Sequence, residues 1–145
     1  MELSFQSATS QDMDLIFQLN RELIDRYENV QDIPYDDVLA WVRRKIQKHI
    51  DSYTRIYAGG VHAGFYRFIA HEENMELDDL YIFPEFQGRG IGSRVIEKCC
   101  KETNRPVMLY VFSRNILAWK LYQRLGFEIR EKIQDSRYIM VRENL

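Results

Sequence analysis

The chain has 145 residues, of which 20 are basic and 22 are acidic, and its formal net charge is −2. This length favours one domain over residues 1–145, able to bury roughly two thirds of the surface that the unfolded chain exposes. The balanced charge argues against nucleic acid as a partner, and the charged start and the lack of a run of about 18 apolar residues argue against a signal peptide and a membrane span.

Strands and helices are predicted from the spacing of apolar residues and from the glycines and prolines that separate the segments. For the N-terminal half we expect a strand at 3–7, a helix capped by Thr9, a helix at about 35–50, and strands at 54–58, 61–71 and 76–82. For the C-terminal half we expect a helix at 90–103, a buried strand at 107–111, a helix at 116–125, and strands at 127–132 and 137–141.

The two cysteines, Cys99 and Cys100, are adjacent in a predicted helix. Neighbouring cysteines do not form the disulfide framework of a secreted protein, and no cysteine and histidine residues have the spacing of metal ligands. We therefore expect a protein of the reducing cytoplasm without a bound metal.

The most informative stretch is residues 80–93, LYIFPEFQGRGIGS, because an apolar strand passes through a glycine loop directly into a helix. Gly88, Gly90 and Gly92 have no Cβ atom, so the backbone can turn tightly and approach a ligand closely. The helix that follows directs its unpaired N–H groups and the positive end of its dipole at an anion. This arrangement predicts a site for a pyrophosphate.

Two well-known nucleotide motifs fit this loop poorly. A P-loop requires a lysine and a Ser or Thr after its last glycine, and no lysine follows these glycines. A dinucleotide-binding loop requires a third glycine where Ser93 stands, and a ribose-binding carboxylate about 20 residues later, where residues 108–111 are MLYV. Both alternatives are therefore disfavoured.

Two motifs together indicate a family. Gln87 to Gly92 fits Q-x-x-G-x-G, and residues 115–127, NILAWKLYQRLGF, place an Asn, an Ala and a Tyr on one predicted helix that ends in Gly-Phe. In both motifs the chain resembles the GNAT superfamily of acyl-CoA-dependent N-acetyltransferases, closely from Glu76 to about Arg142 and in outline before that. The resemblance implies an α/β (α+β) fold with a twisted, mixed, mostly antiparallel sheet flanked by about four helices, and the predicted element order agrees with it.

The resemblance further implies that acetyl-CoA donates its acetyl group directly to a primary amine, on a small molecule, a protein lysine or an N-terminus. The backbone of Leu80, Tyr81 and Ile82 is expected to bind the pantetheine amides as an added strand would, and their side chains are expected to belong to the apolar core. Asn115 is expected to hydrogen-bond the pantetheine arm, and its alternative role is a helix N-cap. The residues expected around the pyrophosphate are Gln87, Gly88, Arg89, Gly90, Ile91, Gly92 and Ser93.

Catalytic residues are implied by the same resemblance. Tyr122 stands where the family has a general acid near the CoA sulfur, although its helical spacing also suits an ordinary core aromatic residue. Glu76 stands where the histone-acetylating branch has its catalytic glutamate, and the alternatives for the general base are Asp78, Asp79 or water. Tyr110 stands where the branch that acetylates ribosomal-protein N-termini has a glutamate, so that mechanism is not copied intact.

The acceptor is predicted only from charge. In this family two N-terminal helices form the acceptor rim, and the acidic residues in or beside them are Asp25, Glu28, Asp32, Asp36 and Asp37. They favour a cationic amine such as a polyamine, an aminoglycoside or a lysine side chain, although any solvated helix pair carries such charges. Fold edges in the family often pair two chains, which allows a homodimer. An alternative of another class is a non-catalytic acyl-CoA sensor or partner-binding module.

Overall fold

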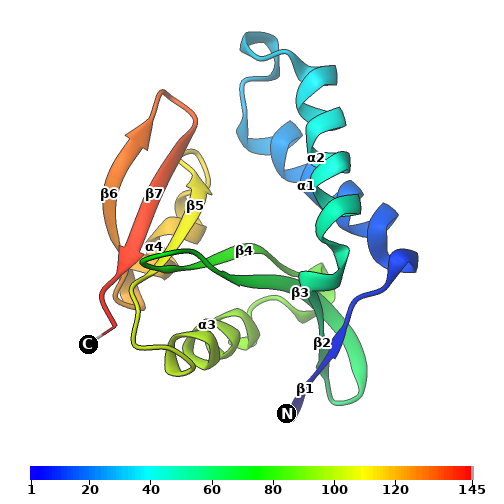
Figure 1. Cartoon of the computed structure of the whole chain (residues 1–145), viewed down its shortest axis with the longest axis vertical. Helices are drawn as coiled ribbons and strands as arrows, with labels where there is room; N and C mark the ends of the chain where they lie inside the picture. Colours follow the sequence, from blue (N-terminus) through cyan, green and yellow to red (C-terminus); the bar gives the residue numbers. More distant parts are fainter. Residues whose placement is uncertain (145) are drawn as a thin grey trace.

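The computed structural model describes residues 1–144 and has one seven-stranded sheet with the order β1-β2-β3-β4-β5-β7-β6 (Figure 1). The strands are β1 (Leu3–Ser7), β2 (Tyr53–Ala58), β3 (Val61–Ala70), β4 (Met75–Ile82), β5 (Val107–Phe112), β6 (Glu128–Ile133) and β7 (Arg137–Arg142). The α-helices are α1 (Met13–Tyr27), α2 (Tyr35–His49), α3 (Ile91–Lys101) and α4 (Ile116–Arg124). The expected mixed α/β fold is confirmed, with element ends that differ from the prediction by a few residues.

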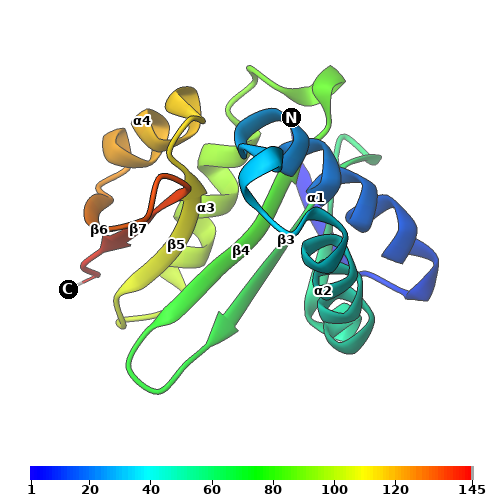
Figure 2. The same ribbon diagram turned by 90° about the horizontal axis from the view of Figure 1, so that it is seen from above.

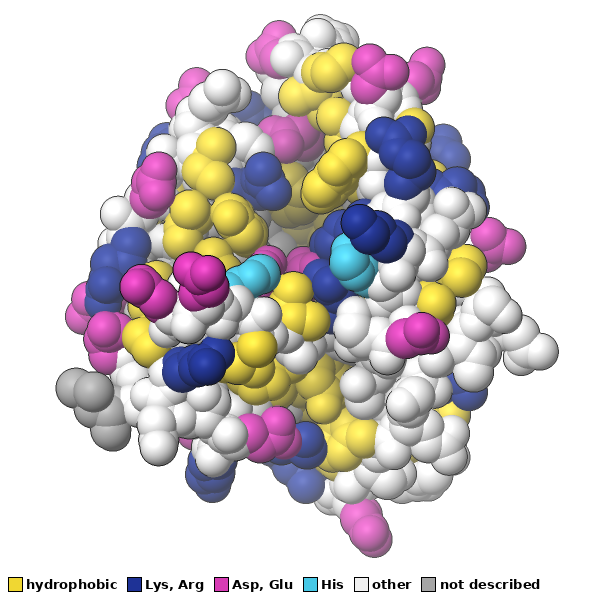
Figure 3. Space-filling view, viewed as in Figure 1, with side chains coloured by type: hydrophobic (Ala, Val, Ile, Leu, Met, Phe, Trp, Pro, Cys, Tyr) yellow, Lys and Arg dark blue, Asp and Glu magenta, His cyan; other side chains and the backbone are white. Residues whose placement is uncertain are grey.

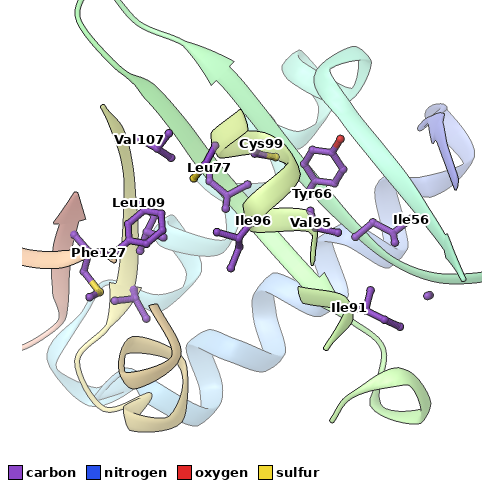
Figure 4. Packing of buried hydrophobic residues seen from close by; sticks show 14 of the residues in the cluster. Ile56, Tyr66, Leu77, Ile91, Val95, Ile96, Cys99, Val107, Leu109 and Phe127 are labelled. Carbon is purple, nitrogen blue, oxygen red and sulfur yellow. The ribbon is translucent and has the colours of Figure 1, made fainter. Parts of the chain in front are cut away.

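The helices lie on both faces of the sheet. Figure 2 shows α1 and α2 together on one side of β3 and β4, and α3 on the other. The larger apolar core lies against α3 and α4, and its buried members include Ile91, Val95, Ile96, Leu109 and Phe127 (Figure 4). A second core lies beneath α1 and α2 around Ile16, Ile46 and Phe65. No helix within residues 1–144 has both the length and the apolar composition that crossing a membrane would need.

The sheet opens between β4 and β5. These two strands are parallel neighbours, and their register consists of Met75 opposite Val107 and Glu76 opposite Met108. Beyond these pairs the strands diverge toward the segment that precedes α3 (Figure 2). The second half of β4 therefore pairs with β3 on one side and has no registered strand partner on the other within residues 1–144.

A β-bulge interrupts β4 at the start of this opening. Phe65 of β3 lies opposite Tyr81, whereas Arg67 lies opposite Asp78, so β4 has one residue more than β3 over this interval. Such an insertion bends a strand and redirects its side chains. Asp79 within the bulge has a φ of 49°, in the left-handed region that residues other than glycine seldom adopt.

Candidate active site

The glycine loop has the backbone that the sequence predicts. Gly88 and Gly90 have φ values of 76° and 77°, which are strained for a residue with a Cβ atom. Gly92 differs, since it lies within the first turn of α3 and a Cβ atom there would be 3.7 Å from the Ile82 side chain, an ordinary contact. The tight turn therefore depends on the first two glycines.

Helix α3 begins directly after this turn. Gly90 is its N-cap, and its first turn carries no acidic side chain. The N–H groups of the first turn have no carbonyl partner within the helix, so they and the helix dipole favour an anion at this end. Arg89 is exposed, and its guanidinium carbon lies 5.4 Å from the centre of the Phe86 ring. The helix start thus combines backbone donors with a nearby cation.

A hollow of about 390 Å³ lies between the glycine loop, the start of α3, the end of β4 and α4. It is lined by Ile82, Phe86, Gln87, Gly88, Gly90, Ile91, Gly92, Ser93 and Leu121. The predicted loop residues and the end of β4 therefore surround one space. A larger hollow of about 600 Å³ lies along the outer side of α3, but charged residues line most of it and it shares only Ser93 with the first.

Two predicted site residues also have structural roles of their own. The side-chain amide of Gln87 donates a hydrogen bond to the Ile82 carbonyl oxygen at 2.8 Å, which ties the loop to the end of β4. Asn115 is the N-cap of α4, where its Oδ1 accepts from the N–H of Ala118 at 3.4 Å. The capping role considered for Asn115 is therefore present in the structure.

Tyr122 lies on the side of α4 that faces the larger core. Its ring packs against this core, with its centre 6.1 Å from that of Phe127. Burial raises the pKa of its hydroxyl to about 12, and no charge or hydrogen bond contributes to the shift. The side chain is thus a core residue with an uncommitted hydroxyl.

The candidate bases have different surroundings. Glu76 is in the last registered pair before the opening, and its Oε1 lies 2.8 Å from Nε2 of His71. Asp78 is ion-paired twice, with Lys45 at 2.7 Å and with Arg67 at 3.1 Å. The carboxylate of Asp78 is therefore already engaged with two cations. Of these two residues, Glu76 is the better placed to accept a proton.

Sequence reasoning missed a polar cluster beneath α1 and α2. It comprises Asn20, Lys45, Tyr53, Arg67, Asp78, Asp79 and Tyr81, which come from α1, α2 and three strands. The side chain of Tyr81 belongs to this cluster, although we had expected it to be part of the apolar core. The successive Asp78 and Asp79 within a strand were the available signal, but the partner residues are distant in sequence.

The face on which we expect the acceptor, called the acceptor side here, is shown in Figure 3, where the surface is hollowed between α2 and the strands β5–β7. Hydrophobic side chains lie on both flanks, and charged and histidine side chains lie between them. Three of the predicted acidic rim residues are engaged: Asp25 accepts from the Tyr35 hydroxyl, Glu28 from Ser136, and Asp32 from Asn29. These three carboxylates are thus hydrogen-bonded within the protein.

Metal and thiol chemistry find little support in the described part of the chain. In residues 1–144, no three His, Cys, Asp or Glu side chains lie close enough together to hold a metal ion. Burial raises the pKa of Cys99 to about 12 and also raises that of Cys100. Because the thiolate is the nucleophilic form, neither cysteine is suited to carry an acyl group.

Relatives match part of the chain. An uncharacterised N-acetyltransferase of Methanocaldococcus jannaschii is 37% identical over 70 residues, which cover 46% of this chain and 31% of that protein. The spermine/spermidine N(1)-acetyltransferase of Bacillus subtilis is 29% identical over 73 residues, which cover 46% of this chain and 48% of that protein. The matched segment thus spans less than half of each relative.

Solved structures match the fold over the whole chain. The PaiA N-acetyltransferase of Thermoplasma acidophilum, solved with coenzyme A, has a TM-score of 0.71 and 18% identity, with 99% of each chain covered. N-acetylglutamate synthase of Neisseria gonorrhoeae, solved with coenzyme A and N-acetyl-glutamate, has a TM-score of 0.70 and 16% identity over 100% of this chain and 36% of that one. The model of the acetyltransferase (GNAT) family matches residues 16–127, which include the glycine loop and most of α1 to α4. The chain therefore belongs to the acetyltransferase (GNAT) family.

Proposed function

We propose that this protein is an N-acetyltransferase that moves the acetyl group of acetyl-CoA directly to a primary amine. One observation carries the proposal: beside the opening to β5, the second half of β4 has no registered strand partner, and its end lines one hollow together with the glycine loop at the start of α3. This arrangement suits a donor that combines an extended, amide-bearing arm with a pyrophosphate. Acetyl-CoA has both parts, and membership in the family supports the same donor.

The donor is held mainly by backbone groups. Leu80, Tyr81 and Ile82 lie in the half of β4 that pairs with β3 on one edge and has no registered strand on the other within residues 1–144. The N–H and C=O groups that face this free edge can pair with the pantetheine amides as a strand would. The pyrophosphate then lies against the loop from Gln87 to Ser93 and the first turn of α3. Asn115 supports the arm from the start of α4.

The chemistry requires a neutral amine, because an ammonium has no lone pair. An amine with a pKa of about 10.4 costs roughly 4.6 kcal/mol to deprotonate at pH 7. We assign this proton to Glu76, directly or through water, since Glu76 lies at the inner end of the opening and its partner His71 can share the proton. Asp78 is disfavoured because its carboxylate is already paired with Lys45 and Arg67.

The amine nitrogen forms the new bond to the acetyl carbon, and the bond from that carbon to the CoA sulfur breaks. The departing thiolate receives its proton from Tyr122, whose hydroxyl stays protonated far above neutral pH. The products are an acetylated amine and CoA with a free thiol. Transfer is direct, because both cysteines are buried thiols rather than thiolates.

We propose a cationic primary amine as the acceptor. Asp36 and Asp37 are exposed in the first turn of α2, on the rim of the acceptor side. One relative is named for spermine and spermidine, which are polycations. The guanidinium of Arg21 lies 3.8 Å from Asp25 and offsets part of the negative charge of the rim, so a monoamine with one flanking charge suits it as well as a long polyamine.

The test combines binding and turnover. Thermal unfolding is measured with acetyl-CoA, and with ATP and NADH as controls, and CoA-thiol release is then measured over a panel of cationic, neutral and anionic primary amines. At about 100 times the dissociation constant, acetyl-CoA should stabilise the fold by roughly 2.7 kcal/mol and raise the melting temperature by several degrees. Thiol release should be fastest with a cationic amine.

Three results would contradict parts of the proposal. A rise in melting temperature with NADH or ATP, but not with acetyl-CoA, would contradict the assignment of acetyl-CoA as the donor. A shift with acetyl-CoA but no thiol release with any amine would favour the acyl-CoA-binding module over the enzyme. Faster release with neutral or anionic amines would remove the cationic acceptor while leaving the reaction itself intact.

A further inference from the structure

The β4 bulge turns two successive carboxylates toward the same helix. In a regular strand, neighbouring side chains point to opposite faces of the sheet. Here Asp78 and Asp79 both approach Lys45 of α2, at 2.7 Å and 3.6 Å, while Leu80 packs against the larger core on the other face. The extra residue of the bulge therefore places Asp79 under α1 and α2, immediately before the backbone that we assign to the donor.

Asp79 connects four elements through one carboxylate. Its Oδ2 accepts from the Tyr53 hydroxyl of β2 at 2.5 Å and from the side-chain amide of Asn20 of α1 at 3.5 Å. Its Oδ1 lies 3.5 Å from the hydroxyl of Tyr81, and Lys45 approaches from α2. The bulge is thereby attached to both helices of the acceptor side.

The local structure at Asp79 costs stability in two ways. Its φ of 49° lies in the left-handed region, which within residues 1–144 only one other non-glycine residue, Gln134, occupies. Burial, together with the neighbouring Asp78, raises the pKa of Asp79 above its ordinary value. A carboxyl with a raised pKa in the folded state lowers the stability once it is ionised. Two features that lower the stability of the folded state at a single residue point to a role of that residue in function.

The position of the bulge suggests that role. After Glu76, β4 loses its β5 neighbour, so the backbone from Asp79 to Ile82 is held by β3 on one side alone. The contacts of Asp79 supply a second attachment for this segment, from β2 and from the two helices. Without them the backbone beside the donor would be freer to shift.

We propose that Asp79 is a positioning residue for acetyl transfer. Its carboxylate anchors the bulge to α1, α2 and β2, and so fixes the backbone of residues 80–82 relative to the acceptor side. Asp79 acts through this backbone and contacts no reacting atom. The inference rests on the proposed function, because fixing this segment matters for a donor bound along β4 and an acceptor bound under α1 and α2.

Three variants separate the carboxylate from the backbone conformation. Asp79→Gly accepts the positive φ without strain, and Asp79→Asn tolerates it while removing the charge. Tyr53→Phe leaves Asp79 in place and removes one anchoring hydrogen bond. If the carboxylate positions β4, kcat should fall about 100-fold in Asp79→Gly and about tenfold in Tyr53→Phe. The CoA dissociation constant should rise together with the fall in kcat, because residues 80–82 hold the donor, while the melting temperature should change little.

The matched control is Gln134→Gly in the turn between β6 and β7. It makes the same backbone change at the other non-glycine residue with positive φ, away from the carboxylate cluster. Its kcat should stay within about twofold of the wild-type value, since only backbone strain is relieved. The kcat of Asp79→Asn should lie between the values of Asp79→Gly and the wild type, because the amide oxygen of Asn can still accept a hydrogen bond from Tyr53.

A measurement without amine separates this inference from the proposed function. Hydrogen exchange of the residue 80–82 amides, followed by NMR, should be faster in Asp79→Gly and Tyr53→Phe than in the wild type. The inference would be overturned if Asp79→Gly had the exchange rates and the kcat of the wild type. It would also be overturned if the fall in kcat only reflected a smaller fraction of folded protein. If the wild type acetylates no amine, the proposed function fails, and the exchange rates decide on the anchor by themselves.

Discussion

At the residue scale, Tyr122 shows how one side chain can satisfy two interpretations. Helical spacing allowed either a general acid or a core aromatic residue. The ring is packed in the core near Phe127, while the hydroxyl has no charge or hydrogen bond that shifts its pKa. Packing fixes the ring, and the free hydroxyl leaves the oxygen available to a leaving group. Core packing is therefore compatible with the acid role.

Tyr122→Phe tests this role because it keeps the ring and removes only the oxygen. We expect kcat to fall about 100-fold while the CoA dissociation constant changes less than about twofold. The pKa of about 12 keeps the hydroxyl protonated below pH 10, so the pH–rate profiles of both proteins between pH 6 and 9.5 should have the same shape. The measurement is thiol release across this range; an alkaline limb that disappears in the Phe variant would contradict the raised pKa.

At the element scale, different parts of β4 contribute to different parts of the candidate site. Its first residues pair with β5, its bulge contacts the helices of the acceptor side, and its last residues face the opening. The close approach of β3 depends on Gly64, where a Cβ atom would lie 2.0 Å from the Tyr81 carbonyl oxygen. No polar or charged signal in the sequence distinguishes Gly64 from an ordinary strand glycine, so its importance became visible only with the neighbouring strand in place.

Gly64→Ala should displace β4, because the clash is with backbone and not with a flexible side chain. Overpacking of this kind costs about 1–3 kcal/mol, which lowers the melting temperature by several degrees for a domain of this size. Gly92→Ala is the stability control, since its added methyl group makes an ordinary contact and alanine favours the helix. Equal melting temperatures for the two variants, measured by circular dichroism, would show that β3 and β4 can separate without cost.

At the scale of the whole molecule, the sheet has two parts joined at one end. The β4–β5 register comprises two residue pairs, and α3 packs on the adjoining core. Across the open end, the Ser136 hydroxyl donates to Glu28 at 2.7 Å, and Tyr27 stacks on Phe112 with ring centres 6.2 Å apart. A donor bound in the opening would therefore contact elements from both parts.

Acetyl-CoA should accordingly protect backbone amides on both sides of the opening. We expect slower hydrogen exchange at residues 80–82 of β4, in the first turn of α3 and at the start of α4, with little change in the antiparallel pair of β1 and β2. Mass spectrometry of exchanged peptides with and without acetyl-CoA measures this. Protection limited to α3 would mean that the loop binds a phosphate while the pantetheine arm lies elsewhere.

Much of the fold could be predicted because its signals are local. Apolar spacing located the strands and helices, Thr9 and Asp12 form the cap before α1, and Gly126, with a φ of 95°, ends α4 as expected. The glycine loop was equally local, since three glycines, a preceding strand and a following helix lie within a few residues. The expected family and fold class are confirmed, whereas the roles assigned to Glu76 and Tyr122 stay predictions.

The sequence by itself determined the order of elements, the tight glycine loop before α3 and the family, because each depends on residues close together in the chain. Only the tertiary structure decided where β4 bulges, that Tyr81 leaves the apolar core, and that Asp78 and Asp79 share Lys45. Those features depend on pairing between strands and on helices that are distant in sequence. A one-residue insertion in the register reverses which face each following side chain occupies. The alternation of apolar and polar residues along one strand does not reveal where such an insertion lies.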